Sequence, residues 1–194
     1  YPITKSVFFR TIGYLANRPQ IDNIRNMMSC PDPHQVEYIG VGAKAIAKLQ
    51  TAPSKVRIIP NGVDFDPEAT PDLSKFSAGT PPVLIEVGRP DKRRSVRAEE
   101  FVPELHEQYP DLTCHVVGRE GEDGNGILYH GLVEDPTPLY REAHFLVHYP
   151  EIEPFGKTVP EAYFHGVIPV VSGKGGIREL VEHEVTGYYL DVPT

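Results

Sequence analysis

Short apolar runs rich in β-branched residues recur along the chain from about residue 82 onward, separated by stretches that mix polar and apolar residues. Two of the runs stop at a glycine, at Gly88 and Gly118. Runs of this length and composition predict buried strands, and the mixed stretches between them predict helices. The expected strands are residues 83–87, 113–117, 127–129, 145–149, 168–172 and 188–190. The expected helices are residues 96–108, 138–143, 157–164 and 177–183.

Strands that alternate with short helices indicate an α/β fold, in which a Rossmann-like parallel sheet carries helices on both faces. The front of the chain differs, because it offers only two strands (36–41 and 55–59) and one short helix (43–49). Residues 67–82 are rich in proline, which is typical of a linker or surface loop. We therefore place a domain boundary near residue 64, between a front piece (1–63) and a Rossmann-like domain (64–194).

Charge narrows the choice of ligands. The 194 residues carry a formal net charge of -8, which disfavours a nucleic-acid partner. Basic residues nevertheless cluster within one short segment, which suits a small anionic ligand, with a solvated loop as the alternative. The cluster consists of Arg89, Lys92, Arg93, Arg94 and Arg97.

Neither cysteine sits in a metal-binding or redox motif. Cys30 and Cys114 lie far apart in sequence, which fits a reducing compartment. No segment reaches the roughly 20 apolar residues that a spanning helix needs. We expect a cytoplasmic location, with peripheral contact at the inner face of a membrane as an open alternative.

Several short motifs fail on geometry, and the sequence predicts no metal site. Gly156-Lys157-Thr158 would need a glycine at position 151 to complete a phosphate-binding loop, and that position is Glu. His144 and His148 lie on an expected strand, so their side chains would stand about 13 Å apart and could not share an ion. Asp64-Phe65-Asp66 matches a metal-binding D-x-D, but it lies at the linker.

The candidate site begins where the first strand of the domain ends. Gly88 and Arg89 close that strand, and Arg94 follows. The carboxyl ends of parallel strands are where such sheets bind ligands. The two arginines could neutralise a pyrophosphate through charge-assisted hydrogen bonds.

Two acidic residues frame the turn after the strand at 145–149. Glu153 precedes the expected helix, whose first backbone N–H groups favour phosphate oxygens. Glu161 follows within that helix, where the alternative is a solvated pair with Lys157. The N–H groups concerned belong to Phe155, Gly156, Lys157 and Thr158. A glycine-rich turn at Gly175 and Gly176 would let backbone approach a ligand, or would simply connect a strand to a helix.

Taken in order, these motifs resemble the carboxyl-terminal domain of GT-B retaining glycosyltransferases of family GT4. The matching segments lie between about residues 55 and 191. They are Asn61-Gly62-Val63-Asp64, Gly88-Arg89 with Arg94 in place of the usual Lys, Glu153-Pro154-Phe155-Gly156 with Glu161, the run 166–171, and Gly175-Gly176 with Glu179. Ser95 stands where the family most often has Gly.

The resemblance implies a metal-independent donor site for a nucleoside-diphosphate sugar, with no cofactor. Arg89 and Arg94 would hold the diphosphate, and Glu161 would accept hydrogen bonds from the ribose. Glu153, together with the backbone amides of residues 155–158, would orient the sugar and the β-phosphate. The edge of the base would lie near Val117 and Gly118.

The resemblance also implies that something is missing. The family has a complete amino-terminal acceptor domain, of which residues 1–63 would be a remnant, and it continues beyond the last strand. We therefore expect a chain shortened at both ends, as a proteolytic fragment or a split gene product would be, which needs the missing domain or a complementary subunit. The alternatives are a non-catalytic nucleotide-sugar-binding module or subunit, and an epimerase or phosphorylase of the same architecture. The acceptor is not identified.

Overall fold

The structure is a computed structural model that describes residues 38–40, 56–58, 60–63, 70–89, 96–151, 153 and 155–190. Several features of the sequence lie outside the described residues: Cys30, the helix expected at 43–49, the basic residues Lys92, Arg93 and Arg94, and the Asp64-Phe65-Asp66 segment. The domain boundary near residue 64 also falls outside them and stays a prediction.

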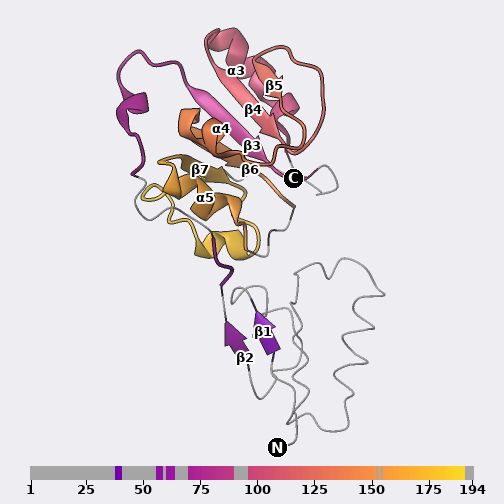
Figure 1. Cartoon of the computed structure of the whole chain (residues 1–194), viewed down its shortest axis with the longest axis vertical. Coiled ribbons are helices and arrows are strands. Elements are labelled where there is room, and N and C mark those ends of the chain that lie inside the picture. The colour runs from indigo at the N-terminus through magenta and orange to yellow at the C-terminus, as the bar shows by residue number, and fades with distance from the viewer. Residues whose placement is uncertain are drawn as a thin grey trace, which may run out of the picture.

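The main body of the molecule is a six-stranded sheet in which all neighbouring strands are parallel (Figure 1). The strands lie in the order β5-β4-β3-β6-β7-β8. The chain thus builds outward from β3 in one direction and then returns to build outward from β6 in the other, which is the doubly wound Rossmann order. The predicted fold class is confirmed. The strands are β3 (Val83–Val87), β4 (Thr113–Val117), β5 (Ile127–Tyr129), β6 (Phe145–His148), β7 (Ile168–Val171) and β8 (Tyr188–Tyr189).

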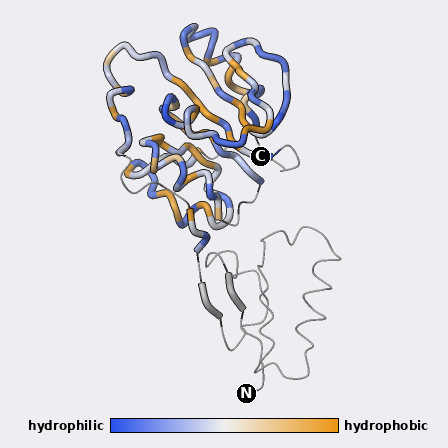
Figure 2. The backbone as a smooth tube through the Cα atoms, in the orientation of Figure 1, coloured by the Kyte–Doolittle hydropathy of each residue, from blue (hydrophilic) through white to orange (hydrophobic). Residues whose placement is uncertain are grey.

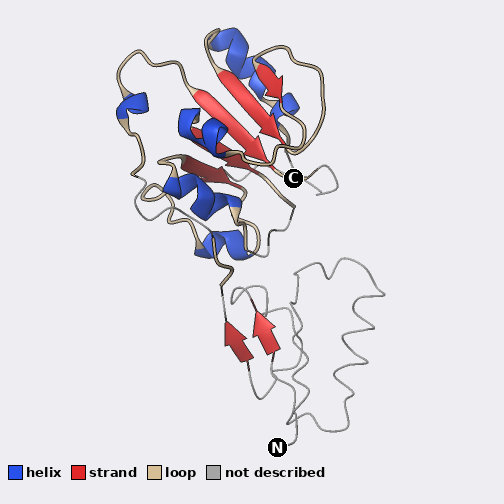
Figure 3. Ribbon diagram, viewed as in Figure 1, coloured by secondary structure: helices blue, strands red, loops and turns tan. Residues whose placement is uncertain are grey.

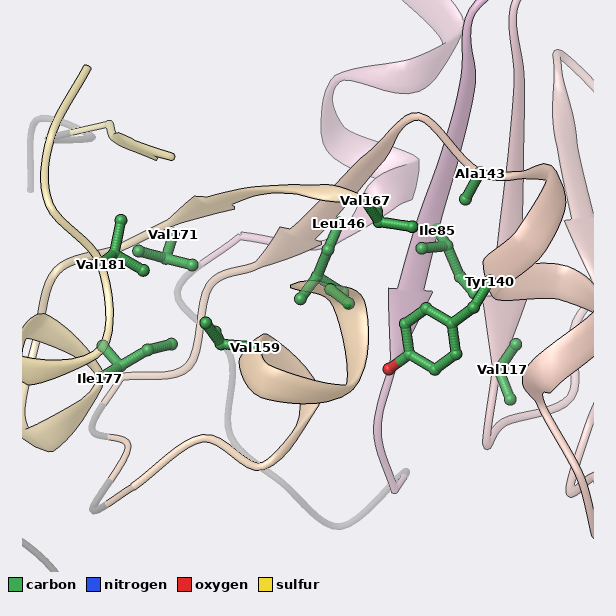
Figure 4. Close-up of a cluster of buried hydrophobic side chains, with 11 residues drawn as sticks. Ile85, Val117, Tyr140, Ala143, Leu146, Val159, Val167, Val171, Ile177 and Val181 are labelled. Atoms are coloured by element: carbon green, nitrogen blue, oxygen red, sulfur yellow. The ribbon is translucent and has the colours of Figure 1, made fainter. Parts of the chain in front are cut away.

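Both faces of this sheet are buried by helices, as its apolar strands require. One face packs against the 3₁₀ helix η3 (Ala98–Glu100) and α3 (Val102–Gln108). The other packs against α4 (Thr137–Glu142), α5 (Thr158–Phe164) and the 3₁₀ helix η4 (Gly176–Glu179) (Figures 3 and 4). Hydrophobic residues concentrate along the strands and polar ones in the connections (Figure 2). Polar groups can therefore be presented only at the ends of the strands.

Strands β1 (Tyr38–Gly40) and β2 (Val56–Ile58) form a separate parallel pair. Both lie inside the segments predicted as strands from the sequence, 36–41 and 55–59. The front piece therefore contains both strands that its apolar pattern predicts.

The helix predicted at 96–108 is not continuous. It is divided into η3 and α3 at Phe101, whose φ of -135° is not helical. Pro103 explains the break, because a proline ring clashes with the carbonyl four residues earlier and cannot continue a helix from that side. In the structure Pro103 stands in the first turn of α3, where a missing N–H costs nothing.

The helix predicted at 177–183 is also shorter than expected, because it ends as η4 at Glu179. Tyrosine hydroxyls donate to the carbonyls that a longer helix would use for its own amides. Tyr163 donates to Leu180 O, and Tyr189 donates to the carbonyls of Arg178 and Val181. Tertiary contacts thus replace the next helical turn.

The proline-rich linker is fixed to the domain by one lysine. Lys75 lies in the 3₁₀ helix η2 (Ser74–Phe76). Its ammonium donates to Ala143 O at 2.6 Å, His165 O at 3.0 Å and Arg141 O at 3.4 Å. These carbonyls lie at the ends of α4 and α5, where helical partners are lacking and positive charge is favourable. One side chain therefore caps two helices.

His144 completes this attachment. Its Nδ1 accepts a hydrogen bond from Val83 N–H at 3.1 Å, and its Nε2 lies 2.7 Å from Lys75 O. Since Nδ1 accepts, Nε2 carries the proton and donates to the lysine carbonyl. The linker is thus tied to the amino ends of β3 and β6.

We expect Lys75→Met to lower the free energy of unfolding by about 1–2 kcal/mol, because it leaves three helix-end carbonyls without their donor. Urea denaturation measures the change. Lys174→Met, which removes a charge from an exposed side chain, is the matched control and should leave stability nearly unchanged. Equal stability of the Lys75→Met and wild-type proteins would contradict the capping role.

Candidate functional site

The order of strands reverses between β3 and β6, so the loops that follow these two strands diverge at the carboxyl edge of the sheet. This is the position at which doubly wound sheets bind ligands. Gly88 and Arg89 follow β3, and the segment from Tyr149 to Glu153 follows β6. Arg89 and Glu153, both predicted as site residues, therefore lie at the same edge of the sheet.

The end of β4 lies against the end of β3 through two glycines. Gly88 N donates to Val117 O at 3.0 Å, and Gly118 has a φ of +98°. A Cβ on Gly118 would lie 2.4 Å from Gly88 O, so no other residue fits without moving the backbone. Two predicted site residues, Gly88 and Gly118, are thus brought together.

The same geometry limits what Val117 and Gly118 can offer a ligand. The Val117 side chain is buried in the core, and its carbonyl already accepts from Gly88. The Gly118 amide donates to Gly131 O at 2.6 Å. These two residues shape the floor of the site by letting strands approach closely.

Glu153 is the most constrained acidic residue at this edge, with only 5% of its surface exposed. Its Oε1 accepts a hydrogen bond from Gly156 N at 3.1 Å, and its Oε2 lies 3.4 Å from His148 Nε2. The amide of Gly156, expected from the sequence to be free for phosphate, is therefore already bound to Glu153.

The glycine-rich turn after β7 holds the backbone of Glu153. Gly176 N donates to Glu153 O at 2.7 Å, and Glu153 N donates to Lys174 O at 3.3 Å. Gly175 has a φ of +89°, and a Cβ there would lie 2.5 Å from Glu153 O. Gly175 and Gly176, both predicted as site residues, thus hold the backbone of the loop that contains Glu153.

The residues that lead into α5 differ in exposure. Phe155 is buried at 8% exposure, and Lys157 is exposed and forms the N-cap of the helix. The hydroxyl oxygen of Thr158 is buried and has no hydrogen-bond partner among the described residues. The start of α5 therefore keeps one polar group that a ligand could satisfy.

Glu161 does not lie on a solvated face, as its pairing with Lys157 alone would require. The hydroxyl of Tyr140 donates to Glu161 Oε2 at 3.3 Å. Figure 4 shows Tyr140 in the core, with its hydroxyl directed toward α5. Burial raises the pKa of Glu161, and the bond from Tyr140 and the charge of Lys157 oppose that shift.

The predicted diphosphate ligands are placed only in part. Arg89 lies at the end of β3 with its side chain exposed, and Arg94 lies outside the described residues. No group of histidine, cysteine or acidic residues in the described part of the chain could hold a metal ion. His144 directly precedes β6 and His148 ends it, so the two stand apart along the strand direction, in agreement with the strand geometry expected from the sequence.

Comparison with protein families decides the identity of this fold. Residues 81–193 match the family model described as "Glycosyl transferases group 1". The chain belongs to this glycosyltransferase family. No curated protein matches the sequence.

Solved glycosyltransferase structures share the fold. Anabaena Alr3699/HepE in complex with UDP-glucose aligns with a TM-score of 0.66 and 20% identity over 92% of this chain. The pneumococcal O-GlcNAc transferase GtfA in complex with UDP and GlcNAc gives 0.62 and 19% over 83%. A GtfA/B complex gives 0.64 and 18% over 91%. The alignments span 57%, 35% and 37% of those chains, so this chain spans about half their length or less.

The glycosyltransferase domain also contains a charged network that the sequence did not reveal. Arg119, which follows Gly118, forms a two-pronged contact with Glu99, and one of its nitrogens lies 3.5 Å from Glu86. Burial alone would raise the pKa of Glu99, but hydrogen bonds from Arg119 and Tyr129 outweigh it and lower that pKa to about 2. The only signal in the sequence was an acidic residue, Glu86, inside an apolar strand.

The structural purpose of this network follows from its contacts. Glu86 Oε2 accepts a hydrogen bond from Ala98 N at 2.8 Å. Ala98 begins η3, the first element after the basic segment, and Arg119 holds its neighbour Glu99. The network thus fastens the far end of the basic segment to β3 and β4.

No described helix combines the length and apolarity needed to cross a bilayer.

The raised pKa of Glu161 predicts a pH-dependent effect of Glu161→Gln. Because the folded state favours the protonated carboxyl, its ionisation at neutral pH costs stability, and this cost disappears once pH falls below the ordinary carboxyl pKa of about 4.3. Glu161→Gln should therefore raise the free energy of unfolding near neutral pH, and the gain should fade on acidification. Denaturant titrations at several pH values measure it, with exposed Glu107→Gln as control. A gain that persists in acid would argue against this assignment.

Proposed function

We propose that the chain is the donor-binding part of a retaining glycosyltransferase of family GT4, which takes a sugar from a nucleoside-diphosphate sugar. The observation that carries the proposal is Glu153, a buried carboxylate fixed at the carboxyl edge of the sheet where the strand order reverses. Burying a carboxylate is costly, and such costs are typically retained at functional sites.

The diphosphate is assigned to the basic segment that follows β3. Arg89 and Arg94 would donate charge-assisted hydrogen bonds to phosphate oxygens. Negative charge builds on the departing diphosphate in the transition state, so fixed positive charge there lowers the barrier without a metal ion.

The nucleoside is assigned to the region between β4 and α5. Glu161 would accept hydrogen bonds from the ribose, while Tyr140 occupies one position on its Oε2. A carboxylate has lone pairs enough for both partners. The base would lie near Val117 and Gly118, at the end of β4, where the backbone of Gly88 approaches Gly118 closely.

The sugar is assigned to Glu153. Because Gly156 N donates to the same carboxylate, a phosphate that used this amide would have to displace Glu153. The amide therefore orients the acid, which leaves Phe155, Lys157 and Thr158 of the originally predicted set for the β-phosphate. Two roles remain open for Glu153, as a nucleophile or as a support for an oxocarbenium-like transition state.

A second candidate function is a nucleotide-sugar-binding subunit that acts with a separate partner. Its support is that one of the similar structures is a complex of two proteins, GtfA/B. Recovery of sugar transfer on adding a separate acceptor-domain protein would favour this alternative. The cytoplasmic location, the membrane contact and the acceptor stay predictions.

We expect the chain to bind a nucleoside diphosphate weakly and to transfer little sugar alone. Isothermal calorimetry across UDP, GDP and ADP tests the first expectation, beginning with UDP because a similar structure contains UDP-glucose. A folded sample that binds none of the three would rule out the donor-site proposal.

Arg89→Ala serves as the site variant in this experiment. It should weaken nucleoside diphosphate binding by roughly 1–3 kcal/mol, the range for hydrogen bonds to charged groups. Arg141→Ala is the control, because Arg141 is exposed at the end of α4, at the amino edge of the sheet. Equal losses for the two variants would indicate a general effect of net charge.

Glu161→Ala separates ribose recognition from phosphate recognition. If Glu161 binds the ribose, the substitution should weaken the nucleoside diphosphate about tenfold, near the loss of one charged hydrogen bond, and leave inorganic pyrophosphate unaffected. Competition calorimetry with both ligands measures the ratio. An equal loss for both ligands would argue against a role of Glu161 in ribose recognition.

A further inference from the structure

We infer that His148 is a positioning residue for Glu153, which holds the carboxylate in the orientation that recognises the sugar of the donor. The inference rests on the proposed function. It deepens that function by naming the group that distinguishes a nucleoside-diphosphate sugar from the nucleoside diphosphate alone.

The position of His148 in the sheet points to this role. It is the last residue of β6 and only 1% exposed. Its neighbour Leu146, two residues earlier on the same face, packs in the core beside α5. An apolar side chain at position 148 would be buried at a lower cost in free energy, because burying an imidazole is unfavourable unless it is hydrogen-bonded.

The charged side chain that His148 faces is Glu153. His148 Nε2 lies 3.4 Å from Glu153 Oε2, and both side chains are buried. Nε2 does not have hydrogen-bond geometry toward the carboxylate, so the contact is an ion pair that forms when the ring is protonated. A protonated imidazole therefore stabilises the ionised acid in a place from which water is largely excluded.

The two carboxylate oxygens of Glu153 have different neighbours, so the two sides of the carboxylate are not equivalent. Gly156 N binds Oε1 from the start of α5, and His148 faces Oε2 from the end of β6. The backbone of Glu153 is held in turn by Gly176 and Lys174. With the main chain held and Oε1 bound by Gly156, the charge of a protonated His148 adds a second restraint on the carboxylate, from the side of Oε2.

Substitutions of His148 test the inference through the selectivity between two ligands. His148→Leu approximately preserves side-chain volume and removes the ionisable ring, whereas His148→Gln keeps a polar side chain without the charge. We expect His148→Leu to weaken UDP-glucose about tenfold while changing UDP less than about twofold, and His148→Gln to restore only part of the loss. Calorimetry with UDP-glucose and UDP on the full chain measures both.

His144→Leu is the matched control, because His144 is buried at the other end of the same strand and bonds to the linker. It should lower the melting temperature without changing the ratio of the two affinities. A double-mutant cycle adds the decisive comparison: in a Glu153→Ala background, His148→Leu should change UDP-glucose affinity less than about twofold.

The outcomes separate the inference from the proposed function. Wild-type protein that is folded but binds neither ligand, nor GDP or ADP, overturns the proposed function and with it the inference. Wild-type protein that binds, with UDP and UDP-glucose weakened equally by His148→Leu, overturns the inference alone. An undiminished effect of His148→Leu in the Glu153→Ala background also overturns it.

Discussion

Burial of both faces of one parallel sheet is the constraint on which the rest of the structure depends. Helices cover each face, so a polar side chain can reach a ligand only from the ends of the strands. The strand order then selects one place along that edge, between β3 and β6, where the loops turn away in opposite directions. Glu153 is at this place because it follows β6, and Arg89 is there because it follows β3.

The two halves of the proposed site are held by different means. Glu153 is buried and bound through its backbone, through Gly156 and beside His148, whereas Arg89 is exposed. A fixed acid fits the recognition of a sugar, which requires defined directions, because little reorganisation is left for the moment of binding. An exposed arginine fits a diphosphate, whose charge acts over a longer range and tolerates more than one geometry. The glutamate half is therefore the part that the chain preorganises by itself.

The sequence predicted the strands well because their signal is local. Short apolar runs, two of them ended by a glycine, predicted all six strands of the main sheet within one residue at each end. The prediction from sequence was wrong where tertiary contacts determine the length of an element. At η4, hydrogen bonds from Tyr163 and Tyr189 take the place of the next helical turn. The break at Phe101 could have been predicted from Pro103. The partners of the site residues could not, since Tyr140 and Glu161 meet only after α4 and α5 have packed on the same face.

His144 and His148 show how the period of an element determines the chemistry of its residues. Four residues apart in a helix, they would lie on one side and could share a ligand, but in β6 they stand at opposite edges of the sheet. His144 is therefore free to bind the linker at the amino edge, through Val83 N and Lys75 O. His148, at the carboxyl edge, faces the acid of the candidate site. Two histidines whose spacing resembles a metal motif in the sequence thus have separate roles: His144 attaches the linker to the domain, and His148 orients Glu153.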